Sequence, residues 1–96
     1  HTAFLGKKVK KVAVCGGAGS FLTVVAKSAG ADVFITGDIK YHEFFDANKK
    51  IIIADIGHFE SEQYTMEIFF ALLSKKLPKF AIHFSKHNTN PVKYLF

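Results

Sequence analysis

A histidine and a glutamate with the spacing of metal ligands follow an apolar segment in the middle of the chain. His58 and Glu62 are four residues apart at the start of an expected helix, so their side chains leave one face in the same direction. An imidazole and a carboxylate placed in this way can bind one transition metal ion, or the carboxylate can bridge two. From spacing alone, a helix start whose His and Glu only satisfy the helix dipole and solvent is the commoner explanation. A pair of ligands does not saturate a zinc-like ion, so such a site must recruit groups from elsewhere.

Two other polar segments also follow apolar, β-branched runs. The first, Cys15 to Ser20, contains three glycines whose backbone amides could approach an anion, although glycines that simply make the turn are more common. The full dinucleotide fingerprint is missing. The second segment begins at Thr36-Gly37-Asp38 and continues to His42 and Glu43.

The catalytic residues remain unassigned at this point. Asp55, His42 and Glu43 are candidates for a general base, but nothing in the sequence gives their geometry. For His42 a pocket-lining role and a surface role both stay open. Cys15 has no adjacent group that would lower the pKa of its thiol, which favours a small buried residue.

The sequence around these residues predicts alternating strands and helices. We expect a helix from Ser20 to Ser28, capped by Ser20 and stopped by Gly30; a short helix capped by Asp38 and running through Ala47; and a long helix over 58–76. Strands are expected at 11–15, 33–36, 51–56 and 80–84, with an edge strand at 92–96. This order predicts a three-layer α/β/α sandwich with a mostly parallel sheet, formed by residues 1–96 as a single α/β domain. In such a sheet, reactive groups gather past the C-terminal ends of the strands.

Composition narrows the class of protein. The chain has 96 residues, 49% of them hydrophobic, which is typical of a packed globular unit with a thin margin of stability. Its single cysteine excludes an intrachain disulfide and favours an intracellular, cytoplasmic setting. No apolar run reaches membrane-spanning length. The net charge of +5 comes from lysine without any arginine, which makes nucleic-acid binding the less favoured reading. The only methionine is Met66, so we expect the chain to be a fragment of a larger protein.

Four segments resemble the dinuclear-metal-centre hexamer family, also known as GTP cyclohydrolase I type 2 homologs. They run in the family's order along essentially the whole chain, and the middle two are fairly specific in combination. The segments are Val12-Ala13-Val14-Cys15-Gly16-Gly17-Ala18-Gly19-Ser20, Ile35-Thr36-Gly37-Asp38-Ile39-Lys40-Tyr41-His42-Glu43, Ile53-Ala54-Asp55-Ile56-Gly57-His58-Phe59-Glu60-Ser61-Glu62 and Asn88-Thr89-Asn90-Pro91-Val92.

The resemblance implies that His58 and Glu62 are ligands of a site with two divalent transition metal ions (zinc, manganese or iron), with Glu62 bridging them. The resemblance therefore reverses the preference, drawn from spacing alone, for a helix start in which these two residues bind no metal. The family's remaining ligands, a neighbouring pair of histidines and an aspartate, belong to an N-terminal half; this chain has no His-His pair, so it resembles the C-terminal portion only. Family members assemble as toroidal hexamers, so a homo-oligomer is expected of the full-length protein.

Two functions of different classes follow from the resemblance. The first is a metal-dependent hydrolase acting on a nucleotide, a phosphoester or a cyclic amide. The alternative is a non-catalytic metal-binding or assembly module whose hexamer is the functional unit. The sequence names neither the substrate nor the metal.

Overall fold

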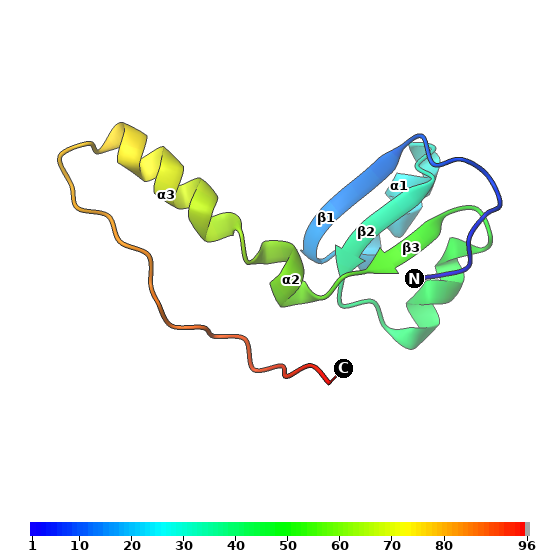
Figure 1. Cartoon of the computed structure of the whole chain (residues 1–96). Helices are drawn as coiled ribbons and strands as arrows, with labels where there is room; N and C mark the ends of the chain where they lie inside the picture. Colours follow the sequence, from blue (N-terminus) through cyan, green and yellow to red (C-terminus); the bar gives the residue numbers. More distant parts are fainter. Residues whose placement is uncertain (96) are drawn as a thin grey trace. The chain divides into compact units, whose positions relative to one another are not determined.

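Three parallel strands form the sheet that positions the candidate residues. In the computed structural model, which describes residues 1–95, the strands are β1 (Val12–Ala18), β2 (Val33–Gly37) and β3 (Ile52–Asp55) (Figure 1). β2 lies between the other two and pairs in parallel with both. The C-terminal ends of parallel neighbours lie at the same edge of a sheet, and the turns after these strands therefore start from one rim. The expected α/β class with a parallel sheet is confirmed.

The pairing of β1 with β2 is interrupted at the glycines. It is regular from Val12 opposite Val33 to Val14 opposite Ile35, and then shifts before Ala18 meets Gly37. Gly17 lies inside this irregularity with φ +66°, a backbone conformation that glycine adopts without steric cost. The strand therefore continues to Ala18, past the expected end at Cys15, and bends where it reaches the rim.

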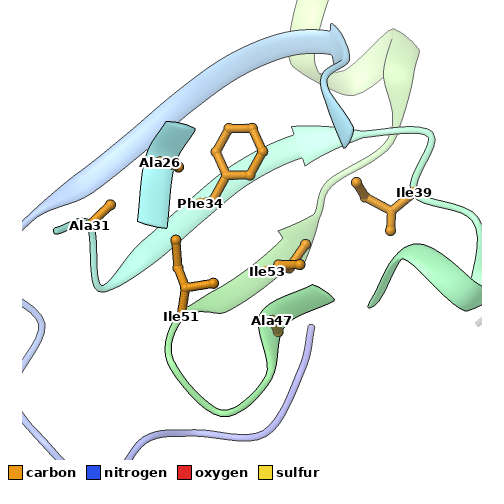
Figure 2. Packing of buried hydrophobic residues seen from close by; sticks show 7 residues of the cluster. All are labelled: Ala26, Ala31, Phe34, Ile39, Ala47, Ile51 and Ile53. Atoms are coloured by element: carbon orange, nitrogen blue, oxygen red, sulfur yellow. The ribbon is translucent and has the colours of Figure 1, made fainter. Parts of the chain in front are cut away.

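The packed core lies on one face of this sheet. Phe34 of β2 and Ile53 of β3 are register partners and are 1% and 0% exposed. They pack with Ala26 of the helix α1 (Thr23–Ser28) and Ala47 of the 3₁₀ helix η2 (Tyr41–Ala47), as Figure 2 shows. Alternation along β1 turns Val12 and Val14 to the opposite face, where Val14 is 71% exposed.

The first connection differs from the expected helix over 20–28 in its beginning. It starts as the 3₁₀ helix η1 (Ser20–Leu22), and the α-helix begins only with α1 at Thr23. Ser20 is not a side-chain N-cap, because its hydroxyl donates a hydrogen bond of 3.0 Å to Oε1 of Glu43. Gly30, with φ +72°, follows the helix end as expected.

The second connection holds η2, and the expectation that Asp38 caps it was wrong. The residue before η2 is Lys40, whose amide donates a hydrogen bond of 2.8 Å to Oε2 of Glu43. In return the Glu43 amide donates to the Lys40 carbonyl at 2.9 Å. This reciprocal pair satisfies the first turn of the helix and leaves the carboxylate of Asp38 available for another contact.

The expectation of one long helix over 58–76 was also wrong, because the helix is interrupted. The structure has α2 (His58–Glu62) and α3 (Thr65–Lys76), separated by a turn at Gln63 and Tyr64. The Ser61 hydroxyl donates to the His58 carbonyl at 2.8 Å. Such a local side-chain bond competes with the helical pattern and weakens the continuation of the helix.

The fourth strand expected at 80–84 is absent from the described residues. Its alternating residues find no hydrogen-bonded neighbour strand; the ring of Phe84 instead stacks on Phe70 of α3 with 4.5 Å between centroids. The Phe80 amide donates to the carbonyl of Leu77 at 3.0 Å, which continues the turn at the helix end. Residues 92–95 likewise form no strand, and the remainder of that expected edge strand, Phe96, lies outside the described residues.

The chain divides into two compact units, His1–Glu62 and Gln63–Phe96, within which the described residues end at 95. The three strands and the polar segments that follow them all belong to the first unit. The expectation of a single domain stays a prediction. Over residues 1–95 no helix combines the length and the apolar character needed to cross a membrane.

Candidate metal centre

His58 and Glu62 lie together on α2, the helix that two residues separate from the end of β3. The Nε2 atom of His58 is 3.2 Å from Oε2 of Glu62. Both side chains are about half exposed, at 49% and 51%. The expected four-residue spacing therefore does direct one ring nitrogen and one carboxylate toward the same point near the rim of the sheet.

The other ring nitrogen of His58 faces a second carboxylate. Nδ1 lies 2.6 Å from Oδ2 of Asp38, which directly follows β2. The hydrogen bond to Asp38 raises the pKa of His58 above its ordinary value, and the charges of Asp38 and Glu62 act in the same direction, while burial opposes them. The sequence placed Asp38 at this rim but favoured a helix cap for it; the contact with His58 depends on the order of the strands in the sheet, which the local pattern does not show.

The glycine turn after β1 contacts the same helix. The Gly17 amide donates a hydrogen bond of 2.8 Å to the hydroxyl of Ser61. Its carbonyl accepts one of 3.0 Å from the buried Thr36 hydroxyl, which ties the turn to β2. A Cβ added to Gly17 would collide with the carboxylate of Glu62 and come within 3.3 Å of the His58 ring. Gly17 therefore permits the close approach of β1 and α2, which agrees with a glycine that shapes a turn.

The carboxylate of Asp55 joins two of the turns at the rim of the sheet. Its Oδ2 accepts a hydrogen bond of 2.9 Å from the Ile39 amide, and its Oδ1 accepts one of 2.9 Å from the Gly57 amide. One carboxylate thus joins the turn that carries Asp38 to the turn that precedes His58. Both oxygens therefore accept hydrogen bonds from backbone amides, and the role of Asp55 as a general base stays a prediction.

Glu43 and His42 have different surroundings. Glu43 joins η1 to η2 through its bonds to Ser20 and Lys40, and the Lys40 amide is the main cause that lowers the pKa of its carboxyl. His42 is exposed on η2. Neither residue has a hydrogen bond to Asp38, His58 or Glu62 within residues 1–95.

Cys15 belongs to the first unit, whereas His83 and His87 belong to the second. Cys15, which was expected to be a small buried residue, is only partly buried; it packs against the core, and its thiol lies 3.5 Å from the carbonyl of Gly16. His83 and His87 are exposed in the second unit.

The amino-acid sequence matches the family model described as Duf34/NIF3 (NGG1p interacting factor 3) over residues 1–91. The chain belongs to the Duf34/NIF3 family. The match confirms the resemblance drawn from the four sequence segments, because similar curated proteins are named GTP cyclohydrolase 1 type 2 homolog.

Two such relatives of the Duf34/NIF3 chain illustrate the extent of the similarity. A GTP cyclohydrolase 1 type 2 homolog of Staphylococcus epidermidis is 44% identical over 91 residues, which cover 90% of this chain and 25% of the relative. One from Campylobacter jejuni is 44% identical over 61 residues, covering 62% of this chain and 24% of the relative. The chain therefore spans about a quarter of the length of the curated relatives that it matches.

Solved structures show the same fold. A Bacillus cereus protein related to NIF3 matches with a TM-score of 0.70 and 36% identity over 95% of this Duf34/NIF3 chain and 27% of that chain. The Staphylococcus aureus protein SA1388 matches with a TM-score of 0.73 and 30% identity over 91% and 30% of the two chains.

Proposed function

We propose that this chain supplies His58 and Glu62 as ligands to a centre of two divalent transition metal ions in a metal-dependent hydrolase. The observation that supports the proposal is the separation of 3.2 Å between Nε2 of His58 and Oε2 of Glu62. Atoms this close can share one ion after a small outward movement, since zinc–nitrogen and zinc–oxygen bonds are about 2.0–2.2 Å long. The carboxylate has a second oxygen, with which Glu62 can bridge to the other ion.

The donor set fits such ions but is incomplete. Imidazole nitrogen and carboxylate oxygen suit zinc, manganese and iron. Within residues 1–95 no group of three or more His, Cys, Asp or Glu side chains could hold a metal ion. We therefore assign the remaining ligands, a pair of histidines and an aspartate, to an N-terminal half of the full-length protein. This completes the site as the family resemblance implies.

The chain's own residues give the site its form. The ions would activate water for attack on a substrate bond. Glu62 is held against the glycine turn, where the hydrogen bond from the Gly17 amide to Ser61 fixes the first turn of α2. The half exposure of His58 and Glu62 leaves their donor atoms open to an ion and to solvent. The similar curated proteins are named for a cyclohydrolase that acts on GTP, and this supports nucleotides as the first substrate class to test.

An assembly role is the second candidate, and exposed apolar side chains favour it. Val14 on the sheet is 71% exposed, and Phe21 and Val24 on the first connection are 74% and 63% exposed. Apolar surface of this kind is typical of protein that is covered by a partner. Under this hypothesis the functional unit would be a homo-oligomer, which the family resemblance implies is a hexamer. The metal would stabilise that oligomer.

One pair of measurements separates these functions. Elemental analysis of the purified full-length protein should find transition metal, and a screen against nucleotides and phosphoesters should find hydrolysis that stops on chelation and returns with the metal. Bound metal with no turnover of any substrate would favour the assembly role. Absence of metal at the His58–Glu62 pair would contradict both forms of the proposal.

A further inference from the structure

Asp38 and Glu62 approach different nitrogens of the same imidazole ring. Asp38 Oδ2 is 2.6 Å from Nδ1 of His58, and Glu62 Oε2 is 3.2 Å from Nε2. A neutral imidazole has one proton for two nitrogens, and the shorter, charge-assisted contact is the stronger competitor for it. When the ring is neutral, the geometry thus favours the proton on Nδ1, and Nε2 is then the nitrogen whose electron pair is available to an ion shared with Glu62.

The backbone on both sides of Asp38 is fixed against the turn that carries His58. Asp38 has φ +55°, a left-handed conformation that aspartate tolerates better than most residues. A Cβ on the preceding Gly37 would lie 2.9 Å from the His58 amide nitrogen, so only glycine allows this approach. On the other side, Asp55 holds the Ile39 and Gly57 amides together.

These restraints distinguish the contact from an ordinary surface ion pair. An exposed pair with two mobile side chains contributes little, because ordering them costs entropy. Here Asp55 and the close approach at Gly37 join the backbone of the Asp38 turn to that of the His58 turn. Bringing the Asp38 carboxylate to the His58 ring therefore costs less conformational entropy. A backbone in a less common conformation beside a candidate ligand is also a feature of functional sites.

We infer that Asp38 is a positioning residue that holds His58 with Nδ1 protonated and with Nε2 presented to the ion shared with Glu62. The inference rests on the proposed metal centre for its purpose, but the orientation of the ring can be tested without metal. A carboxylate behind a metal-binding histidine fixes the tautomer and the ring orientation, and its loss typically weakens metal binding about 10–100-fold.

Two substitutions at Asp38 separate its carboxylate from its backbone conformation. Asp38→Gly removes the hydrogen-bond acceptor and retains freedom to adopt a positive φ. Asp38→Asn also tolerates that φ and keeps an amide oxygen that can accept from Nδ1. The matched control is Asp46→Asn, which makes the same change of charge at an exposed residue of η2.

The first readout is zinc affinity of the full-length protein, stripped with a chelator and titrated with zinc alone. Asp38→Gly should weaken binding about 10–100-fold, Asp38→Asn should recover part of the loss, and Asp46→Asn should leave it unchanged. The second readout is the ¹⁵N spectrum of the His58 ring in the metal-free protein, recorded at a pH above the pKa of His58, where the ring is neutral and the spectrum reports the tautomer. The native protein should show the Nδ1-protonated form, and Asp38→Gly should lose it.

The outcomes distinguish this inference from the proposed function. If Asp38→Gly keeps both the zinc affinity and the Nδ1-protonated ring, Asp38 does not position His58. If His58→Ala leaves zinc binding intact, the metal centre fails, while the ring spectrum still decides the role of Asp38. A folded Asp38→Asn variant provides the same two readouts should Asp38→Gly prove unstable.

Discussion

The backbone amide of Gly17 donates a hydrogen bond of 2.8 Å to the hydroxyl of Ser61, so the turn after β1 is joined to the helix that carries His58 and Glu62. The same Ser61 hydroxyl donates to the carbonyl of His58 at 2.8 Å. One serine therefore links Gly17, which has no side chain of its own, to the helix on which both candidate ligands lie.

Gly17→Ala should weaken metal binding as well as stability. The substitution places a Cβ against the carboxylate of Glu62 at a residue with φ +66°, where a side chain costs about 1–2 kcal/mol. Gly6→Ala is the matched control, because Gly6 has φ +68° and nothing within 4 Å of an added Cβ. Urea unfolding should show a cost for both variants, and zinc titration of the full-length protein should show a loss for Gly17→Ala alone. Native zinc affinity in Gly17→Ala would contradict the proposed role of this turn.

Asp32→Asn should reduce stability at neutral pH and have little effect in acid. Asp32 accepts hydrogen bonds from the amides of Lys10 and Lys11 at 2.9 and 3.0 Å and pairs with Lys7. The Lys7 ammonium, followed by these amides, holds the pKa of Asp32 well below its ordinary value of 3.8. A carboxyl whose pKa is lower in the folded state stabilises the fold above the unfolded-state pKa, and this contribution disappears as the pH falls through the folded-state value.

The native protein should therefore lose stability between about pH 5 and pH 2 more steeply than Asp32→Asn, so that the difference between them is largest near neutral pH. Thermal unfolding at pH 7, 5 and 3 measures this, with Asp46→Asn as a control for the change of net charge. A difference that stays constant with pH would show that the ionised carboxylate is not the cause.

Residues 1–96 alone should bind transition metal weakly. His58 and Glu62 supply only part of a coordination sphere, and most of the affinity of a complete site depends on the missing ligands. Exposed apolar residues such as Val14 and Phe21 should also make this chain self-associate. Calorimetry with zinc or manganese tests the first expectation, and sedimentation tests the second. Submicromolar, stoichiometric binding to a monomer would mean that this chain holds a complete site, for instance through His42 or His83.

The strand ends could be predicted from the sequence, and the contacts between the turns could not. Short β-branched runs followed by glycine place the polar segments at Gly17, Asp38 and His58 on one rim, because parallel strands end at the same edge. The hydrogen bond between Asp38 and His58 joins turns after two different strands, so it depends on which strands are neighbours. That order is a property of the assembled sheet, and no local pattern contains it.

The wrong expectations have the same physical origin. Residues 80–84 alternate as a strand does, but a strand needs a hydrogen-bonded neighbour, and Phe84 stacks on Phe70 instead. The apolar spacing of 58–76 is helical throughout, yet the bond from Ser61 to the carbonyl of His58 favours a break after Glu62. In both cases a tertiary or side-chain contact outweighs the local pattern.

Elemental analysis of the full-length protein and of its His58→Ala and Glu62→Ala variants tests the proposed metal centre most directly. Each substitution removes one donor from a half-exposed position and no core volume, so both variants should fold and bind less metal. Glu62→Ala should lose more, because a bridging carboxylate serves both ions. The controls His83→Ala and Glu67→Ala, at exposed residues of the second unit, should keep the native content. We predict two transition metal ions per native chain and a clear deficit in each ligand variant; a folded His58→Ala or Glu62→Ala protein with the full native stoichiometry would contradict the proposed metal centre.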